Sequence, residues 1–275
     1  MPGRQPQGPS RGRDRHRPCG ARPESPADLL GRVHDVCGGV NAARPGQPVW
    51  YQLYPIDVED VGMAIARRAE RAGCPALILT VDLNAGRNLE TQLRLARTDT
   101  RTCSQCHGDG IPAYVRRKPM FDGLDVSRVT AVEYPGMTWD YVRRMRDNVP
   151  KMKLVIKASP AGILTAAAVM HSIDAIVVSN HGGRAEDSGR STIECLPEVL
   201  GAVAHRVPVL IDSGFRRGTD VVKAIALGAT AVGVGRPYLW GLAAFGQPGV
   251  EWCSRSCVAR PRLVMRQLVA TTILS

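Results

Sequence analysis

The stretch Asp174-Ala-Ile-Val-Val-Ser-Asn-His-Gly-Gly-Arg184 joins a short apolar run to a polar turn that contains two glycines. A continuous apolar run of this length is typical of a strand buried on both faces of a parallel sheet. The polar turn follows at the carboxyl end of that strand, where parallel α/β folds place their chemistry. The stretch therefore predicts both a fold class and the position of a site.

Similar apolar runs lie along the rest of the chain, and amphipathic segments separate them. Val58, Val61, Ile65 and Ala69 recur at helical spacing before Gly73, a typical helix stop. Repeated βα units predict either a parallel barrel or an open, doubly wound sheet. The predicted strands cover residues 49–54, 76–82, 153–157, 175–180, 207–212 and 231–235, with Thr138 as the cap of one helix and 220–225 within another.

Polar residues and glycines gather where these strands end. In a barrel they would all line one rim, whereas in an open sheet they would spread along an edge. The residues are Gln52 and Tyr54, Thr80 and Asp82, Lys157, Asn180 and His181, Asp212 and Gly214, and Gly235 and Arg236.

Composition excludes several classes of protein. The chain has 275 residues, 44% of them hydrophobic, without an apolar run near the ~20 residues that a membrane span needs. The net charge is +11, but the eight arginines before Val49 lie among prolines and glycines without aromatic stacking residues, so we expect no nucleic-acid partner. The eight cysteines are scattered and no signal-peptide core precedes them, which predicts reduced thiols and a cytoplasmic protein.

Residues 1–47 are predicted to be a low-complexity, disordered basic segment, and residues 48–275 are predicted to be a barrel domain.

Three loops carry the residues with chemical potential. His181 stands beside two glycines that admit a ligand and beside Arg184, which can bind a carboxylate through two hydrogen bonds. This combination suits proton abstraction next to a carboxylate. The stretches Asp212-Ser-Gly-Phe-Arg-Arg-Gly-Thr-Asp220 and Gly233-Val-Gly-Arg-Pro237 each lie between a strand and a helix, where backbone N–H groups and arginines can hold a phosphate.

These motifs resemble one enzyme family. S-N-H-G-G-R, D-S-G-F-R-R-G-T-D and G-R-P-Y-L-W-G-L-A, together with W-Y-Q-L-Y at 50–54 and L-T-V-D at 79–82, are similar to the FMN-dependent α-hydroxy-acid dehydrogenases, which include lactate and glycolate oxidases. The resemblance covers about residues 49–250. It implies a (β/α)₈ barrel that binds FMN and oxidises an L-2-hydroxy acid to the 2-oxo acid, with oxygen, a quinone or a cytochrome as the electron acceptor. It also implies a possible homo-oligomer.

The resemblance assigns roles to individual residues. His181 would be the base, Asp82 its partner, Tyr54 a substrate contact, and Arg184 and Arg87 the groups that bind the substrate carboxylate. The turn from Asp82 to Arg87 is one residue shorter than the commonest family spacing. The cofactor would be held by Gln52, Thr80 and Lys157 at its ring, by Asp212 at its ribityl chain, and by Gly214, Arg216, Gly235 and Arg236 at its phosphate, with Ser213 as a further cofactor-binding residue.

Two segments depart from this pattern. A closed barrel needs eight strands, but only six are predicted from Val49 onward, so the first two are missing or degraded. One hypothesis is a shifted reading frame at 30–41 and again at 251–260, where the sequence interrupts an expected amphipathic helix. A catalytically impaired barrel fragment and a flavin-dependent barrel isomerase therefore stay open as alternatives. The stretch Cys103-Ser-Gln-Cys-His107 matches a haem-attachment pattern, which we interpret as a lid-like loop without metal or haem.

Overall fold

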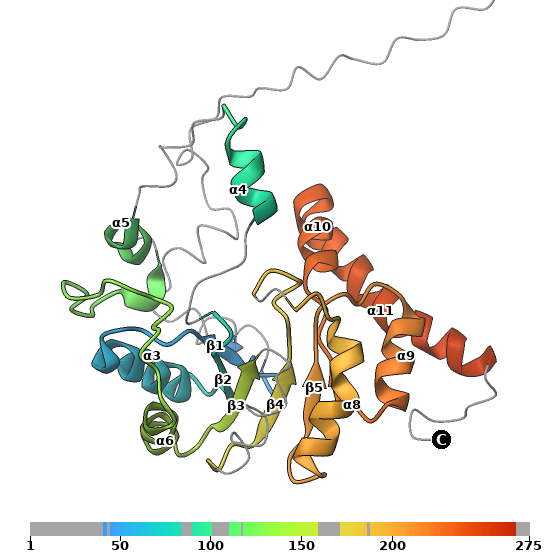
Figure 1. Ribbon diagram of the computed structural model, residues 1–275, viewed down its shortest axis with the longest axis horizontal. Helices are drawn as coiled ribbons and strands as arrows, with labels where there is room; N and C mark the ends of the chain where they lie inside the picture. Colours follow the sequence, from blue (N-terminus) through green and yellow to red (C-terminus); the bar gives the residue numbers. More distant parts are fainter. Residues whose placement is uncertain are drawn as a thin grey trace, which may run out of the picture.

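A computed structural model describes residues 41–42, 45–83, 90–100, 110–116, 118–158, 171–185 and 188–267 (Figure 1). The strands are β1 (Tyr51–Leu53), β2 (Ala76–Thr80), β3 (Lys153–Ala158), β4 (Ala175–Val178), β5 (Val209–Ile211) and β6 (Ala231–Val232). The helices are α3 (Glu59–Arg71), α4 (Glu90–Ala96), α5 (Gly110–Arg116), the 3₁₀ helix η1 (Pro119–Phe121), α6 (Trp139–Asn148), α8 (Thr192–Val203), α9 (Gly218–Ala226), α10 (Arg236–Phe245) and α11 (Gln247–Gln267).

The six strands form one parallel sheet in sequence order, β1-β2-β3-β4-β5-β6. A doubly wound sheet reverses its strand order at a switch point, whereas a barrel keeps the order of the sequence. The observed order therefore favours the barrel over the open sheet. Within the described residues the sheet is two strands short of the eight of a closed barrel, so the prediction of an incomplete barrel-type fold is confirmed.

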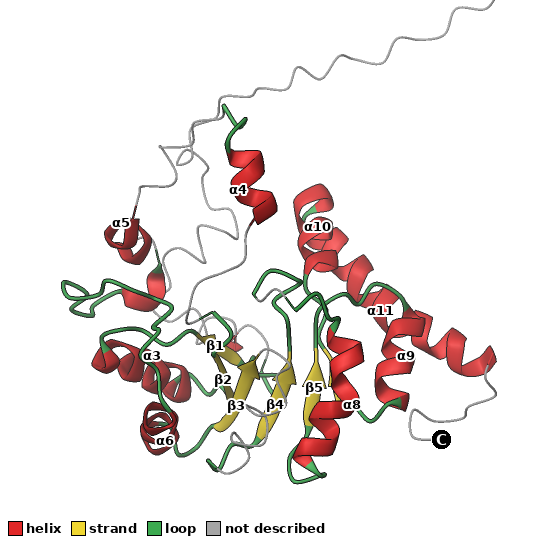
Figure 2. Cartoon of the chain, viewed as in Figure 1, coloured by secondary structure: helices red, strands yellow, loops and turns green. Residues whose placement is uncertain are grey.

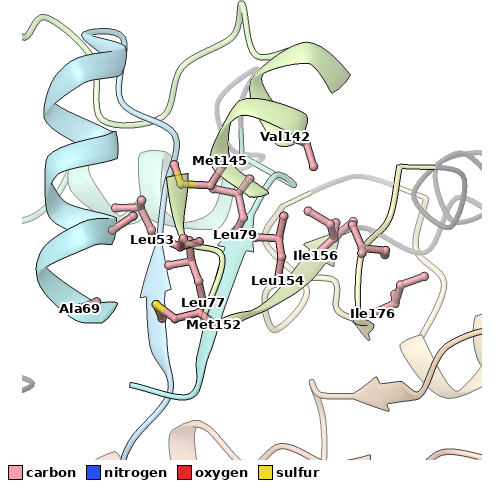
Figure 3. Close-up of a cluster of buried hydrophobic side chains, with 14 of the residues drawn as sticks. Leu53, Ala69, Leu77, Leu79, Val142, Met145, Met152, Leu154, Ile156 and Ile176 are labelled. Carbon is pink, nitrogen blue, oxygen red and sulfur yellow. The ribbon is translucent and has the colours of Figure 1, made fainter. Parts of the chain in front are cut away.

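Both faces of the sheet are buried, as the continuous apolar runs predict. On the outer face, Leu77 and Leu154 pack against helical residues such as Ala69 and Met145 (Figure 3). The inner face carries a separate, smaller cluster of Ala76, Val155, Ala175 and Val177. Since successive side chains of a strand point to opposite faces, every second residue faces the barrel interior.

Helices α3, α6, α8 and α9 pack against the outer face of the sheet, whereas α4 stands clear of it (Figure 2). The predicted end of α3 is confirmed, because Gly73 follows it in the left-handed conformation with a φ of +82°. Thr138 caps α6 as predicted, since its hydroxyl accepts a hydrogen bond from the Tyr141 amide at 3.5 Å. Among the described helices, none is both long and apolar enough to cross a membrane.

Two expectations differ from the structure. Most strands are shorter than predicted, with β1 covering only Tyr51–Leu53 and β6 only Ala231–Val232, because the chain turns at the polar strand ends. The expectation that 251–260 interrupts a helix is wrong, because this segment lies within α11. It contains neither glycine nor proline before Pro261, so its helical propensity outweighs its irregular apolar pattern.

The start of β4 is joined to α6 and β3 by the carboxylate of Asp174. It forms ion pairs with Arg146 and with Lys153, whose Nζ lies 3.0 Å away, and it accepts a hydrogen bond from the Leu154 amide at 2.8 Å. Burial raises the pKa of Asp174, but the hydrogen bond from the Leu154 amide and the two nearby cations together lower the pKa by more than burial raises it. The pKa of Asp174 therefore lies below its usual value. Asp174 therefore stabilises the fold most when it is ionised.

We expect Asp174→Asn to lower the free energy of unfolding by about 2 kcal/mol at pH 7. A carboxylate with a lowered pKa stabilises the fold above its unfolded pKa, and this contribution is lost as the pH falls through the folded value. The difference between wild type and variant in urea unfolding should therefore shrink from pH 6 to pH 3. Asp147→Asn, which alters an exposed carboxylate nearby, should change stability by less than about 0.5 kcal/mol. A difference that does not change with pH would contradict this account.

Candidate active site

The inner face of the sheet leads into a polar cluster at the carboxyl ends of the strands. Ala76 belongs to the inner cluster with Ile78 packed against it, and the alternation of side chains places Thr80 on the same face. Thr80 is the register partner of Lys157 on β3, and Ile78 is the register partner of Gln52 on β1. Three neighbouring strands thus bring an amide, a hydroxyl and an ammonium group to one rim. Two of them are in contact, since Gln52 Nε2 donates to Thr80 Oγ1 at 2.9 Å.

His181 and Asp82 lie together although 99 residues separate them in the chain. The imidazole Nδ1 is 3.2 Å from each carboxylate oxygen. The side chain of Asp82 is fully buried, and that of His181 is only 11% exposed. An ionised carboxylate accepts but cannot donate, so we assign the proton of the neutral imidazole to Nδ1. The lone pair of Nε2 is then able to accept a proton.

Lys157 and Tyr54 complete this cluster. Lys157 Nζ lies 3.3 Å from Nδ1 of His181 and 3.6 Å from Oδ2 of Asp82. Because Nδ1 carries a proton, we pair the ammonium group with the carboxylate rather than with the imidazole. The hydroxyl of Tyr54 lies 3.2 Å from Nε2, on the side of the ring away from Asp82. The cluster therefore holds one imidazole in a fixed tautomer with its basic nitrogen beside a hydroxyl.

The turn after β4 holds His181 in an uncommon backbone conformation. His181, Gly182 and Gly183 have φ values of +58°, +78° and +78°. The left-handed region disfavours a residue with a Cβ, so other interactions must stabilise His181 there. The His181 amide donates to Ser179 Oγ at 3.1 Å, and the Gly183 amide donates to Asn180 Oδ1 at 2.9 Å. The side chains that precede His181 thus fix its backbone.

The loops after β5 and β6 hold the next peptide of this turn. The Gly182 amide donates to Ser213 Oγ at 3.1 Å, and the Ser213 hydroxyl donates to Asp212 Oδ1 at 2.7 Å. Arg236, the first residue of α10, donates to the Gly182 carbonyl. A Cβ at Gly182 would overlap this guanidinium group, and the φ of +78° also favours glycine there. Three strand-end loops therefore meet at one residue.

Two glycines leave open space near these loops. A Cβ at Gly214 or at Gly235 would meet no atom within 4 Å. Arg216 follows Gly214 by two residues, but its guanidinium donates to the Phe215 carbonyl at 2.7 Å and lies 5.1 Å from the ring centroid of Trp240. Arg236 instead donates to the Gly182 carbonyl, so the shared role of the two arginines at a phosphate stays a prediction.

Comparison with known proteins identifies the family. The model of the FMN-dependent dehydrogenases matches residues 33–274. The chain belongs to the FMN-dependent dehydrogenase family. A 2-hydroxyacid oxidase of Dictyostelium discoideum is 36% identical over 77% of this chain and 53% of its own length. An L-lactate oxidase of a Nostoc species is 40% identical over 74% of this chain and 55% of its own. The crystal structure of mandelate oxidase matches 87% of this chain and 65% of that protein with 34% identity and a TM-score of 0.69.

The chain thus spans just over half the length of these two curated relatives. The family match begins at residue 33, within the segment 1–47 that is predicted to be disordered. Of that segment the structure describes residues 41–42 and 45–47, and Asn41 Nδ2 donates to the Ala72 carbonyl at 2.8 Å. Arg87 and the cysteines and histidine at 103, 106 and 107 lie outside the described residues. No group of three metal-ligating side chains occurs in the part of the chain that is described.

The structure thus brings together some of the site residues predicted for a family member. His181, Asp82, Tyr54 and Lys157 form one cluster, and Gln52 contacts Thr80. Arg184 is exposed, and its Nε donates to the His181 carbonyl at 3.2 Å, so it lies beside the turn that carries His181.

Sequence reasoning gave no role to Ser179, although this residue begins the S-N-H-G-G-R motif, and it did not single out Thr192, which lies in no motif. Thr192 Oγ1 donates to the Asp212 carbonyl at 2.7 Å, and both hydroxyl side chains belong to fully or nearly fully buried residues.

The donor set fits FMN in its chemistry. The groups of Gln52, Thr80 and Lys157 can donate to the carbonyls and nitrogens of a flavin ring, and Asp212 can accept from ribityl hydroxyls. The open backbone at Gly214 and Gly235, beside the start of α10, can approach a phosphate. These residues could hold the cofactor along a single rim of the sheet, from β1 to β6.

Proposed function

We propose that this chain binds FMN and oxidises a small L-2-hydroxy acid, such as lactate, glycolate or mandelate, to the 2-oxo acid. The observation that carries the proposal is the contact of His181 with both Asp82 and Tyr54 at the end of the inner sheet face. When bound, FMN supplies an acceptor for the two electrons that leave the substrate. The family match favours this reaction over that of a flavin-dependent isomerase.

His181 is the base in this proposal. Its Nε2 takes up one proton from the substrate, and the resulting imidazolium is stabilised by the carboxylate of Asp82 at 3.2 Å from Nδ1. Because Asp82 is fully buried, little water competes for this interaction. The substrate gives up its hydroxyl proton and its C2 hydrogen together with two electrons, which leaves the 2-oxo acid.

Cationic and hydroxyl groups position the substrate and the cofactor. Arg184 binds the substrate carboxylate through its planar guanidinium group, together with Arg87. Tyr54 donates to the substrate from the Nε2 side of the imidazole. Lys157 places a positive charge at the end of β3, where it stabilises negative charge on the flavin ring.

The test uses the purified full-length chain. We expect a yellow protein with flavin absorbance whose colour is bleached when L-lactate, glycolate or L-mandelate is added without oxygen. The D enantiomers of lactate and mandelate serve as controls and should leave the colour unchanged. Bound FMN that none of these acids reduces would refute the proposed reaction.

A second candidate is a catalytically impaired barrel fragment of the same family. One observation favours it: the sheet has six strands in the described residues, two short of a closed barrel. An open barrel exposes strand edges and leaves the cofactor rim incomplete. Protein that stays colourless and takes up no added FMN would support the fragment, and sedimentation would show whether it self-associates.

We also propose a cytosolic location. The cysteines at 74, 253 and 257 are free thiols, which suits a reducing compartment. Fractionation of cells that express a tagged full-length chain tests this location.

A further inference from the structure

Ser213 occupies a backbone conformation that a serine rarely adopts. Its φ is +75°, in the left-handed region where glycine is favoured. A non-glycine residue persists in such a conformation when its surroundings hold it there, and such positions cluster at functional sites. The hydrogen bonds of the Ser213 hydroxyl, which a glycine would lack, indicate why a serine is present here.

The Ser213 hydroxyl uses both of its hydrogen-bonding roles. It donates its proton to Asp212 Oδ1 at 2.7 Å and accepts the Gly182 amide at 3.1 Å. The carboxylate withdraws the hydroxyl proton, which makes the oxygen a stronger acceptor for the amide. The hydroxyl therefore bridges the loop after β5 and the turn after β4.

This bridge lies one peptide from the imidazole. Gly182 follows His181 directly. A glycine backbone is flexible unless hydrogen bonds fix its amide and its carbonyl. Ser213 holds the amide, and Arg236 holds the carbonyl. A change in the backbone orientation of Gly182 would rotate the backbone of His181 and move its Nε2 away from the hydroxyl of Tyr54.

We propose that Ser213 is a positioning residue, whose hydroxyl fixes the Gly182 peptide and, through it, the imidazole of His181. Its catalytic consequence rests on the proposed function, but the positioning itself does not. The bridge also links the base to Asp212, the residue predicted to hold the ribityl chain of the cofactor. Cofactor binding and the orientation of the base are therefore coupled through a single hydroxyl.

The test compares Ser213→Gly with Ser213→Ala. Both remove the hydroxyl, but glycine relieves the left-handed backbone and alanine does not. The control is Ser254→Ala on α11, where an exposed hydroxyl donates to the Val250 carbonyl at 2.9 Å, remote from the site. In the cofactor-free chain, ¹H–¹⁵N spectra of the histidine ring report the tautomer and order of His181. In the FMN-loaded chain, kcat, KM and the dissociation constant of FMN are measured.

We expect both Ser213 variants to broaden or split the His181 ring signals and to lower kcat about tenfold. The KM should change less than kcat, since Arg184 is untouched. Wild-type ring signals and wild-type kcat in Ser213→Gly would overturn the inference, even if Ser213→Ala is impaired, because only backbone strain would then matter. If the wild type binds no FMN or oxidises no hydroxy acid, the proposed function fails, while the ring spectra still decide the role of Ser213.

Discussion

Replacing His181 with glutamine should lower kcat for the hydroxy acid about 10³-fold, because a positioned general base contributes on the order of 10²–10⁴ to a rate. Glutamine keeps a polar group near Tyr54 but has no nitrogen that accepts a proton at neutral pH. The variant should still bind FMN, since Gln52, Thr80 and Lys157 remain. Stopped-flow measurement of flavin bleaching under anaerobic conditions checks the chemical step directly.

The matched control is His171→Gln, which alters a histidine stacked on Trp139 at 4.6 Å, remote from the cluster. It should keep the wild-type rate of bleaching. If His181→Gln bleaches the flavin at the wild-type rate, another residue is the base and the proposed mechanism is wrong. If His181→Gln loses FMN as well as activity, the imidazole supports the cofactor site rather than the proton transfer.

The fold could be predicted from the sequence because its strands are buried on both faces. A continuous apolar run such as Ala175–Val178 predicts a strand that is buried on both faces of the sheet. The helices between such runs predict that the strands are parallel. The ends of the strands were harder to predict. Residues 80–82 still look like part of a strand in the sequence, but in the structure the strand ends at Thr80 and the chain turns at Asp82. The helix through residues 251–260 was missed because its apolar residues do not follow a regular helical spacing. The helical propensity of the segment, rather than its apolar pattern, accounts for the helix.

The sequence predicted that His181 and Asp82 lie at one rim, and the structure brings them together, but their supporting contacts could not be predicted. His181 and Asp82 follow from motifs at two strand ends that a parallel sheet brings to one rim. The role of Ser179 depends on the positive φ of His181. The role of Ser213 depends on its own positive φ and on its contact with Gly182, 31 positions away, which no local pattern encodes. The contact of Arg216 with Trp240 likewise needed coordinates.

Replacing Asp82 with asparagine should have the second large effect, on both activity and stability. The amide nitrogen of asparagine can donate to Nδ1 of His181, which would favour the tautomer that carries its proton on Nε2. That tautomer cannot take up the substrate proton, so we expect kcat to fall about 10³-fold. Lys157 would also lose its carboxylate, 3.6 Å away in a buried setting, at a cost of about 3–5 kcal/mol of unfolding free energy.

The double variant Asp82→Asn with Lys157→Met separates the two effects. Removing the cation as well leaves no unpaired charge at the end of β3, so the double variant should be more stable than Asp82→Asn alone. Its activity should stay low, because the tautomer of His181 is still wrong. Urea unfolding and anaerobic bleaching, measured on the same preparations, test both statements. A double variant less stable than either single one would show that Lys157 has another buried partner. An Asp82→Asn variant with wild-type kcat would exclude the carboxylate as the group that fixes the imidazole.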